Sequence, residues 1–516
     1  MISKEVIIGS NPLTLKEIES ILFSKYKISL SDKALKTVSD SYQFLINFSK
    51  GKLIYGINTG FGPMAQYKIG EENLKKLQYN LIRSHCAGTG DLLTELDTKA
   101  LMIARLNSLM LGYSGVHTDL VYLLMQLINK NIFPLVYQHG GVGASGDLVQ
   151  LAHLALALIG EGQVKHKGSI INTDLLFKKE KLKALSIYKR EGIAVLNGTS
   201  AMTGIGCINL IYSKKLLNWA IILSTLINEI AEAYDDHFSK ELNQVKRHEG
   251  QNYVANKMRL LSQGSQLIKR RSDVLYNKQI DEHILIDKVQ EYYSLRCVPQ
   301  ILGPIYETII KAEEVIINEI NSVNDNPIID KKNKDVYHGG NFHGDYVALE
   351  MDKLKIAITK LSMLSERQLN YLLNDKLNQK LTPFLNLGTL GLNYGLQGMQ
   401  FTATSTVAES QTLSMPNYIH SIPNNNDNQD IVSMGTNGSL LTRKVIENAF
   451  EVLAIHTIAV MQAIDVIDCS KKLSPKGLSI YKSFRKVCSK TIEDKPLSSS
   501  IGTAIIFLKE SNLTDI

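Results

Sequence analysis

Residues 139–147 read HGGVGASGD, and this short loop contains two patterns that would perform different chemistry. The six residues from Gly141 to Gly146 fit G-x-G-x-x-G, the spacing of loops that bind a dinucleotide pyrophosphate at a helix N-terminus. A helix-like run follows, and Glu161 lies 20 residues after Gly141, where a ribose-binding acid is expected. The middle of the loop, Ala-Ser-Gly, permits a second chemistry that needs no nucleotide.

The sequence around the loop does not support a dinucleotide site. Such a site needs a parallel strand after the helix, whereas residues 162–172 alternate around Lys-Gly and predict a β-hairpin. The repeated βαβ alternation of a doubly wound sheet is also missing. The serine-hydrolase elbow G-x-S-x-G fails because Asp147 stands where its last glycine belongs. We therefore predict neither NAD binding nor a serine hydrolase.

The triplet Ala144-Ser145-Gly146 has the residue types that allow a backbone to cyclise. In a tight bend the amide nitrogen of Gly146 reaches the carbonyl carbon of Ala144, since glycine leaves that nitrogen unhindered and tolerates unusual φ/ψ values. Loss of one water closes the ring, and loss of a second from the Ser145 hydroxyl leaves an alkene conjugated to an imidazolone. The product is an electrophile that no ordinary side chain provides. An Ala-Ser-Gly triplet is common in proteins, so the other motifs of the sequence decide whether it is expected to cyclise.

The elements around the loop are predicted to be helices with a few short strands. Residues 14–50 have helical spacing interrupted at ISLSD, which predicts two short helices, the second capped by Ser or Asp. Residues 53–65 contain too much Gly, Asn and Pro for a helix, so we expect a short strand that enters a functional loop. Helical patterns return at 71–82 and 95–112.

Beyond about residue 200 the sequence predicts long apolar helices. One covers 346–375, where apolar residues at helical steps form a single face, namely Met351, Leu354, Ile358 and Leu361. A similar helix covers 440–467. Together with the sparse β signal, this predicts a mainly α protein with a mixed N-terminal lobe over 1–200 and a bundle of long helices over 201–516. Helices this apolar are expected to bury faces against other subunits too.

Composition excludes several classes of protein. The 516 residues are 44% apolar and 21% charged, typical of a soluble globular protein, and the net charge of +7 comes from scattered lysines without interleaved aromatics, so nucleic acid is not expected. Five widely spaced cysteines form no C-x-x-C pair, which predicts no metal site, no disulfide framework and a reducing cytoplasm. The N-terminus has no long apolar stretch and no run is judged long enough to span a membrane.

Seven further blocks accompany the HGGVGASGD loop between residues 55 and 435, and with it they resemble the aromatic amino acid ammonia-lyase family. They are YGINTGFG, NLIRSHCAGTG, LNGTSAMTG, YYSLRCVPQ, NDNP, GGNFHGD and NQDIVSMG, in family order. The closest likeness is to bacterial tyrosine ammonia-lyases. One departure is Gln150, where many members have proline; it lies beyond the cyclising triplet.

The resemblance implies a fold, a cofactor and an activity. The fold is an ammonia-lyase/fumarase-like helical core, and the cofactor is a methylideneimidazolone (4-methylidene-imidazole-5-one) formed from residues 144–146, with no metal. The reaction is non-oxidative removal of ammonia and a β-proton from an aromatic L-amino acid, for which an electrophile and a well-placed base are needed. The resemblance further implies a homotetramer whose sites are shared between subunits.

The resemblance also assigns roles to individual residues. Tyr55 matches the base that removes the β-proton, and Arg296 matches the guanidinium that forks onto the substrate carboxylate. Tyr293 lies near the amine, and Gln290 supports it; steps of three put Gln290, Tyr293 and Arg296 on one helical face if the segment is helical. Asn197 matches an asparagine that binds the carboxylate or the ring carbonyl, although a turn asparagine would look the same.

Four more positions bear on the aromatic end of the substrate or on the loop. Phe342 matches an aromatic residue beside the prosthetic ring, and a core phenylalanine is the plain alternative. Asp147 is expected to orient the loop backbone. The pair Ser84-His85 lies where ring selectivity is set, and a His there can bind a phenolic hydroxyl or an imidazole, which disfavours phenylalanine.

Gln429 completes the substrate prediction. Histidine lyases typically have Glu at this position, whereas phenylalanine and tyrosine lyases resemble this chain in having Gln. His85 with Gln429 therefore indicates L-tyrosine, with trans-p-coumarate and ammonia as products. The alternatives are a histidine ammonia-lyase, which would give urocanate, and a tyrosine aminomutase, which would give β-tyrosine. From a different class altogether, a nucleotide-binding or purely helical scaffold protein would show no cyclisation at 144–146.

Overall fold

The computed structural model describes residues 4–277, 283–285 and 288–511. Within these residues the protein is mainly helical, as predicted, and its strands are short. The chain divides into two compact units, each assembled from separate stretches. The first consists of Met1–Ile211, Ala312–Asp352 and Pro416–Arg443, and the second of Tyr212–Lys311, Lys353–Met415 and Lys444–Ile516. The division of the chain into domains at residue 200 stays a prediction.

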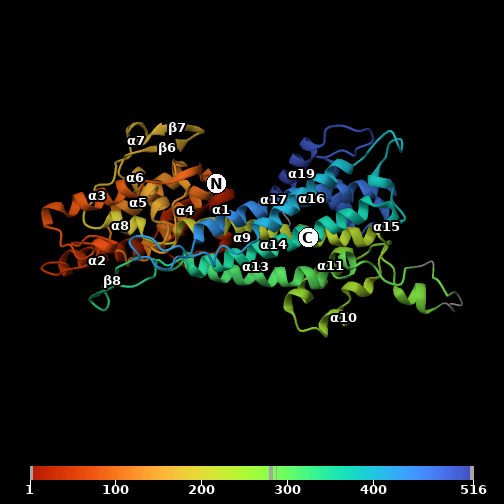
Figure 1. Ribbon diagram of the computed structural model, residues 1–516, viewed down its shortest axis with the longest axis horizontal. Helices are drawn as coiled ribbons and strands as arrows, with labels where there is room; N and C mark the ends of the chain where they lie inside the picture. The colour runs from red at the N-terminus through yellow and green to blue at the C-terminus, as the bar shows by residue number, and fades with distance from the viewer. Residues whose placement is uncertain (1–3, 278–282, 286–287, 512–516) are drawn as a thin grey trace. The chain divides into compact units, whose positions relative to one another are not determined.

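The first unit contains all the described strands and eight complete α-helices (Figure 1). The helices are α1 Leu15–Phe23, α2 Asp32–Phe48, α3 Leu74–His85, α4 Glu95–Met110, α5 Thr118–Lys130, α6 Leu148–Leu158, α7 Thr173–Glu180 and α8 Glu191–Leu196. The strands are β1 Glu5–Ile8, β2 Lys27–Leu30, β3 Thr89–Leu92, β4 Phe133–Pro134, β5 Tyr137–His139, β6 Gln163–His166, β7 Ser169–Asn172, β8 Ile328–Asp330 and β9 Asp335–Tyr337.

The second unit is built from helices, and four long helices contribute residues to both units. Those of the second unit alone are α10 Lys240–Gln244, α11 Glu249–Ser262, α12 Tyr293–Arg296, α15 Asp375–Asn378, α16 Gln397–Leu413, α18 Pro475–Arg485 and α19 Ser498–Glu510. The four shared helices are α9 Ser200–Ile230, α13 Val298–Ile320, α14 Asp345–Leu373 and α17 Gly435–Val466.

Local sequence signals explain where the first helices begin. Thr14 and Glu17 form a capping box at the start of α1, and the Ser31 side chain caps α2, as predicted. Helices α3 and α4 confirm the patterns at 71–82 and 95–112. The predicted hairpin is also confirmed, because β6 and β7 pair antiparallel and lie beside α7 in Figure 1.

The strand expected within residues 53–65 was wrong. The backbone there forms turns and a short 3₁₀ helix, Gly62–Met64, and its only described β-pairing is an isolated bridge at Thr59. Ile54 and Ile57 are nevertheless buried, in a core cluster with Leu45 and Ile329. The apolar residues of this stretch therefore anchor a loop, not a strand.

Helix α4 runs through the core of the first unit. Every residue from Ala100 to Met110 is buried, including the polar side chains of Arg105 and Asn107. Buried polar groups need hydrogen-bond partners. Arg105 finds some of its partners in segments that carry the candidate site, as described below.

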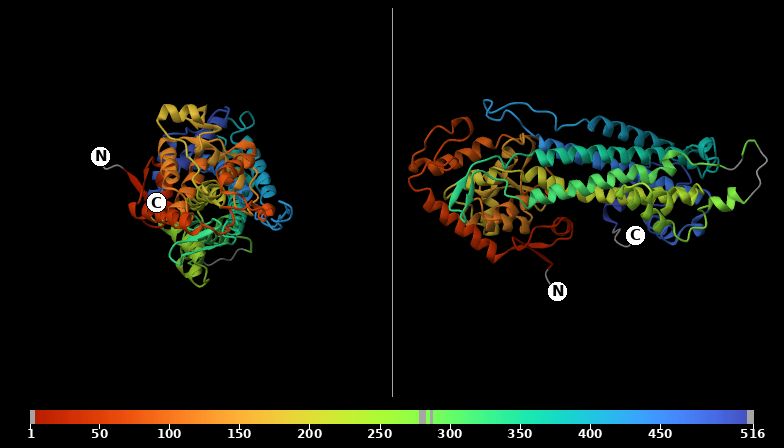
Figure 2. Two further views of the ribbon diagram at one scale, coloured as in Figure 1. Left: turned by 90° about the vertical axis from the view of Figure 1, so that its left-hand side faces the viewer. Right: turned by 90° about the horizontal axis from the view of Figure 1, so that it is seen from below.

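The helical segments of the second unit run side by side (Figures 1 and 2). Polar side chains join them: Gln368 of α14 donates to Ser224 of α9 at 2.9 Å, and Trp219 of α9 donates to a carbonyl of α19 at 3.0 Å. The predicted apolar face of α14 is confirmed, since its four residues Met351, Leu354, Ile358 and Leu361 are fully buried.

The expectation that no run is long enough to span a membrane was wrong by length and composition alone, because two helices in the described part of the chain, α9 and α17, meet both criteria. Their most apolar windows are 78% and 83% buried inside the protein. Such burial is typical of core helices.

Candidate active site

The loop over residues 139–147 is held by backbone contacts from two distant segments. Met434 donates its amide to the carbonyl of Val142 at 2.9 Å. The next carbonyl, that of Gly143, accepts from the amide of Gly344 and from the hydroxyl of Ser433, both at 3.0 Å. Residues that are distant in the sequence, Ser433 by 290 positions, thereby fix the loop immediately before the Ala-Ser-Gly triplet.

The triplet itself is tightly bent. Gly146 has φ +71°, and a Cβ built on it would lie 2.0 Å from the carbonyl oxygen of Gly198. Asp147 donates its amide to the same oxygen at 2.8 Å, and Ala144 is only 4% exposed. Only glycine fits at position 146, and glycine is the residue whose amide the cyclisation requires. The residues present therefore fit the predicted prosthetic group.

Asp147 ties the triplet to the beginnings of two long helices. One carboxylate oxygen accepts from the amides of Ala201 at 2.7 Å and Met202 at 3.0 Å, at the N-terminus of α9. The other accepts from the hydroxyl of Thr436 near the start of α17. Burial raises the pKa of Asp147 to about 6, while these hydrogen bonds act in the opposite direction. The expectation that Asp147 orients the loop is consistent with these contacts.

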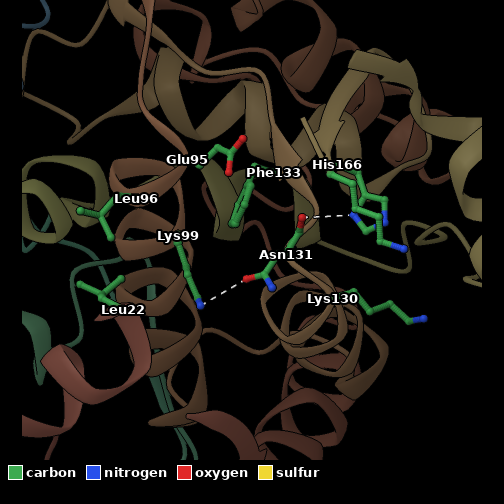
Figure 3. Close-up of a pocket in the computed structure, with 9 residues that line it drawn as sticks. Leu22, Glu95, Leu96, Lys99, Lys130, Asn131, Phe133 and His166 are labelled. Atoms are coloured by element: carbon green, nitrogen blue, oxygen red, sulfur yellow. Dashed lines mark hydrogen bonds between the residues drawn. The ribbon is translucent and has the colours of Figure 1, made fainter. Parts of the chain in front are cut away.

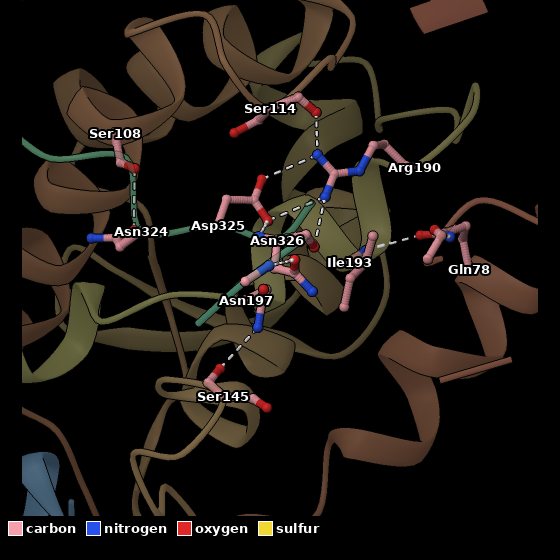
Figure 4. A network of polar contacts seen from close by, with 12 residues as sticks. Gln78, Ser108, Ser114, Ser145, Arg190, Ile193, Asn197, Asn324, Asp325 and Asn326 are labelled. Atoms are coloured by element: carbon pink, nitrogen blue, oxygen red, sulfur yellow. Dashed lines mark hydrogen bonds and ion pairs between the residues drawn. The ribbon is translucent and has the colours of Figure 1, made fainter. Parts of the chain in front are cut away.

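Two side-chain amides meet at Ser145. Asn197 donates to the carbonyl oxygen of Ser145 at 3.1 Å (Figure 4). Gln429 donates to the hydroxyl oxygen of the same residue at 2.9 Å. The structure thus brings together three residues predicted from three different blocks. The carbonyl oxygen bound by Asn197 would remain as the oxygen of a cyclised ring, whereas the hydroxyl oxygen bound by Gln429 is the one that would leave as water.

Arg105 holds the backbone of Asn197 in place, and it was not predicted from the sequence. Its guanidinium donates to the Asn197 carbonyl at 2.6 Å, to Ser108 at 2.9 Å and to Asn324 at 3.1 Å. Burial lowers the pKa of Arg105 to about 10. A single Arg inside the apolar run LMIARLNSLM was the available signal, because a buried guanidinium must bind specific partners.

A buried ion pair holds the neighbouring segment. Arg190 and Asp325 are both fully buried, and the guanidinium donates to both carboxylate oxygens at 3.2 Å (Figure 4). Arg190 also donates to the carbonyls of Ser114 at 2.5 Å and Asn326 at 3.1 Å. Asp325 belongs to the NDNP block. This block therefore holds Arg190 in place close to the segment that carries Asn197.

Tyr55 lies in the loop that was expected to be functional. Its hydroxyl accepts a hydrogen bond from the Gly62 amide at 3.2 Å, and its ring meets Phe61 and His338 edge-on, with centroids 6.3 and 6.5 Å away. The side chain is half-buried. One edge of a partly exposed phenol is therefore available to a ligand while the other is fixed.

The Tyr55 loop is adjacent to the segment that carries Gln429. Asn424 and Gln429 exchange two backbone hydrogen bonds at 3.1 and 3.3 Å, which closes a short turn. Asn425 in that turn lies against Gly62, since a Cβ built on Gly62 would be 2.9 Å from its amide nitrogen. Tyr55, Gln429 and Ser145 are thus linked through successive contacts in the first unit.

Ser84 and His85 end helix α3. The His85 Nδ1 lies 2.9 Å from the carbonyl oxygen of Leu81, and burial lowers the pKa of the His85 imidazole. Because a carbonyl only accepts, Nδ1 carries the proton, which leaves Nε2 of the neutral ring as an acceptor. Just beyond the helix, Gly88 donates to His153 of α6 at 3.2 Å, so this segment lies beside the helix that follows the triplet.

Phe342 belongs to a loop that contacts the triplet loop. It is half-buried and lies two residues before Gly344, whose amide binds the Gly143 carbonyl. The Asn341 side chain fixes the other side of this loop on the carbonyl of Val323 at 3.2 Å.

Gln290, Tyr293 and Arg296 belong to the second unit and are described by themselves. The Arg296 guanidinium donates to Gln290 and lies 4.5 Å from the centroid of the Tyr293 ring, which is 69% exposed. The expected single helical face was wrong for Gln290, because α12 begins at Tyr293. Arg296 nevertheless contacts both of the other side chains, because the chain bends before the helix.

Two further observations concern the alternative sites. Glu161, the candidate ribose-binding acid, is bound to Arg83 at 2.6 Å, and the hairpin after α6 is antiparallel, so the dinucleotide interpretation has no structural support. Within the described ranges, no three His, Cys, Asp or Glu side chains group as metal ligands would.

Comparison with known proteins identifies matches along nearly the whole chain. The family model described as "Aromatic amino acid lyase" matches residues 13–486. A histidine ammonia-lyase from Caldanaerobacter subterraneus subsp. tengcongensis is 35% identical over 515 residues, covering 99% of this chain and 98% of that protein. A tyrosine 2,3-aminomutase from Chondromyces crocatus is 36% identical over 512 residues, with 97% and 96% coverage.

Solved structures agree with these matches. A tyrosine aminomutase from Streptomyces globisporus superposes with a TM-score of 0.93 at 32% identity, covering 98% of this chain and 97% of that chain. The helical architecture predicted from the sequence is therefore confirmed by the helices observed and by their likeness to an enzyme of known fold.

Proposed function

The chain belongs to the aromatic amino acid lyase family, and we propose that it removes ammonia from L-tyrosine to give trans-p-coumarate. The single observation that carries the proposal is the clamped triplet at residues 144–146. Its glycine admits no side chain, and its serine receives hydrogen bonds from Asn197 and Gln429.

The prosthetic group of the family would be held by the contacts already described. A methylideneimidazolone formed from Ala144, Ser145 and Gly146 supplies an electrophile that makes the amino group a better leaving group. Asn197 is placed to orient its one oxygen, the former Ser145 carbonyl, or the substrate carboxylate, and Gln429 lies beside the Ser145 side chain that would form the alkene. Asp147 and Arg105 hold the surrounding backbone, so their contribution is indirect.

The remaining residues bind the substrate and move its proton. Tyr55 takes the β-proton on its phenolic oxygen, and the Gly62 amide that already donates to this oxygen supports negative charge there. Arg296 binds the substrate carboxylate with its planar guanidinium, and Gln290 and Tyr293 hold that guanidinium in position. Phe342 supplies an aromatic wall.

His85 and Gln429 support tyrosine as the substrate. The free Nε2 of His85 is an acceptor, so a phenolic hydroxyl can donate to it, whereas the bare ring of phenylalanine would leave it unpaired at a cost of roughly 1–3 kcal/mol. Gln429 is neutral, and histidine lyases typically carry a charged Glu there. Ser84 lies beside His85 and completes the polar end.

The relatives are named for two different activities, so a histidine ammonia-lyase and a tyrosine aminomutase are the two alternative functions. The histidine lyase and the tyrosine aminomutase match this chain at nearly equal identity, 35% and 36%. An imidazole N–H could also donate to His85, which favours histidine as the second candidate substrate. An aminomutase would return ammonia to the β-carbon.

The test of the proposal uses purified full-length chain without added cofactor. We expect tyrosine to be converted into an ultraviolet-absorbing arylacrylate, faster than histidine or phenylalanine in a three-way competition. The intact chain should be lighter than its sequence by two waters. Ser145→Ala should abolish both the mass deficit and turnover, while Ser169→Ala on the exposed hairpin should change neither. Turnover by Ser145→Ala would contradict the proposal, faster urocanate formation would favour the histidine lyase, and β-tyrosine would favour the aminomutase.

We also propose that the enzyme acts in the cytoplasm as a homotetramer. Large apolar side chains are exposed on helices of the second unit, among them Phe401 at 66% and Ile356 at 48%. Apolar surface on helices is typical of faces that bury against another subunit. Light scattering of the purified chain tests the assembly.

A further inference from the structure

A cavity of about 480 Å³ lies in the first unit (Figure 3), and none of its lining residues belongs to the candidate active site. It is lined by the end of α1, the start of α4, the segment between α5 and β4, and the turn of the β6–β7 hairpin. The lining residues are Leu22, Glu95, Leu96, Lys99, Lys130, Asn131, Phe133, His166 and Lys167. Cavities of this size hold small organic ligands.

Lys99 places a half-buried ammonium on the cavity wall without an acidic partner. Its Nζ donates to the carbonyl of Ile21 at 3.1 Å and to the side-chain oxygen of Asn131 at 3.3 Å, both of them neutral. Across the described part of the chain no carboxylate lies within ion-pair distance of it. Burial lowers the pKa of Lys99, which shows that its charge is poorly compensated. A ligand anion would supply the missing partner.

The other charges of the wall leave an excess of positive charge. Lys130 is neutralised by Glu180 at 2.7 Å, and Glu95 is neutralised by Lys165 at 3.2 Å. Lys167, at the exposed hairpin turn, adds a second ammonium to the lining, although Glu180 interacts with its charge as well as with Lys130. The electrostatic potential of the cavity therefore favours an anion.

His166 adds a buried polar atom that has no hydrogen-bond partner. Its residue is 8% exposed, and Nδ1 lies 3.3 Å from the carbonyl oxygen of Asn131 (Figure 3). Nε2 has no hydrogen bond, and its closest acidic atom belongs to Glu180 at 4.0 Å. This nitrogen is covered by surrounding protein atoms, so it adds polar character behind the wall and is not itself open to a ligand.

The rest of the wall is apolar. Leu22 and Leu96 lie on one side, and Phe133, which is 6% exposed, lies on the other (Figure 3). An ion without an apolar body would leave these surfaces uncovered. From the cations and the apolar wall together, we propose that this cavity binds a small aryl carboxylate, with Lys99 contacting the carboxylate.

Isothermal titration of the full-length chain with 3-phenylpropanoate tests the proposal. We expect a site whose affinity falls roughly tenfold or more in Lys99→Met, because a charge-assisted hydrogen bond is lost. Lys33→Met, on the exposed face of α2, is the matched control and should leave binding unchanged. Lys167→Gln lies at an exposed turn that carries no core packing, so it should weaken binding even if Lys99→Met does not fold.

Two ligand controls identify the chemistry. The neutral 3-phenylpropanamide should bind at least roughly tenfold more weakly than the acid, since it lacks the charge. Inorganic phosphate at equal concentration should not displace the acid, since it lacks an apolar body. Equal binding by wild type and both lysine variants, by acid and amide, or by acid and phosphate would overturn the proposal. The heat of binding is independent of turnover, so a chain inactive toward tyrosine can still confirm this site.

Discussion

Gly146 and Gly198 lie in direct backbone contact. The two residues form an isolated parallel bridge, and the carbonyl oxygen of Gly198 occupies the position where a Cβ of residue 146 would stand. The positive φ of Gly146 independently disfavours any residue with a side chain. Two separate restrictions therefore reserve this position for glycine, and both coincide with the amide required for ring closure.

The first prediction concerns Gly146→Ala. The new methyl group would collide with backbone that has no room to move, so we expect a loss of several kcal/mol in the free energy of unfolding and no loss of two waters from the chain. Gly168→Ala is the control, because Gly168 has φ +81° but open space around its Cβ; it should cost about 1 kcal/mol. Urea unfolding and intact mass measure the two effects. A variant at 146 with wild-type stability and the full mass deficit would contradict this account.

A second prediction concerns His85→Phe. Removing the Nε2 acceptor should lower kcat/KM for tyrosine relative to phenylalanine by about tenfold to a hundredfold, the range for one lost hydrogen bond. Ser84→Ala, at the neighbouring position, should change the ratio much less. Competition assays with both amino acids measure it. An unchanged ratio in His85→Phe would show that this residue does not face the substrate ring.

The helices were predictable because their apolar spacing and caps are local signals. Thr14 and Ser31 sit where the capping rules place them. The loop around Tyr55 was mistaken for a strand because its Gly, Asn and Pro content excluded a helix. That content is equally typical of a loop, and the burial of Ile54 and Ile57 that anchors this loop depends on Leu45 and Ile329, which are distant in the sequence.

The residues of the site were predictable only in part. Ser145, Asn197 and Gln429 come from separate blocks, and the resemblance supplied them. Arg105 and Arg190 were missed because a buried guanidinium is defined by its partners, and these lie up to 219 residues away in the sequence. Only the folded chain brings such partners together.

The third prediction concerns the buried pair of Arg190 and Asp325. Arg190→Met leaves a fully buried carboxylate without its cation, and we expect a loss of about 3–5 kcal/mol in the free energy of unfolding. Adding Asp325→Asn to this variant should restore part of the lost free energy of unfolding, because the uncompensated negative charge disappears. Lys178→Met breaks an exposed pair with Asp174 and should cost less than about 1 kcal/mol. A double-mutant cycle in urea checks these values, and equal costs for Arg190→Met and Lys178→Met would refute the prediction.

The last prediction concerns the pH dependence that Asp147 gives to stability. Burial raises its pKa from 3.8 to about 6, so the folded chain binds this proton more tightly than the unfolded chain does. The resulting contribution to the free energy of unfolding is complete below about pH 4 and is lost as the pH rises through about 6, with a slope of at most about 1.4 kcal/mol per pH unit. Asp147→Asn removes the titration, although its NH₂ group faces two backbone donors and the variant should be less stable throughout. The difference between wild type and Asp147→Asn should therefore shrink between pH 4 and 6. Urea unfolding of both chains across this pH range measures the difference. A flat or rising difference for Asp147→Asn would mean that the carboxylate is ionised in the fold across this range, held by Thr436 and the amides of α9.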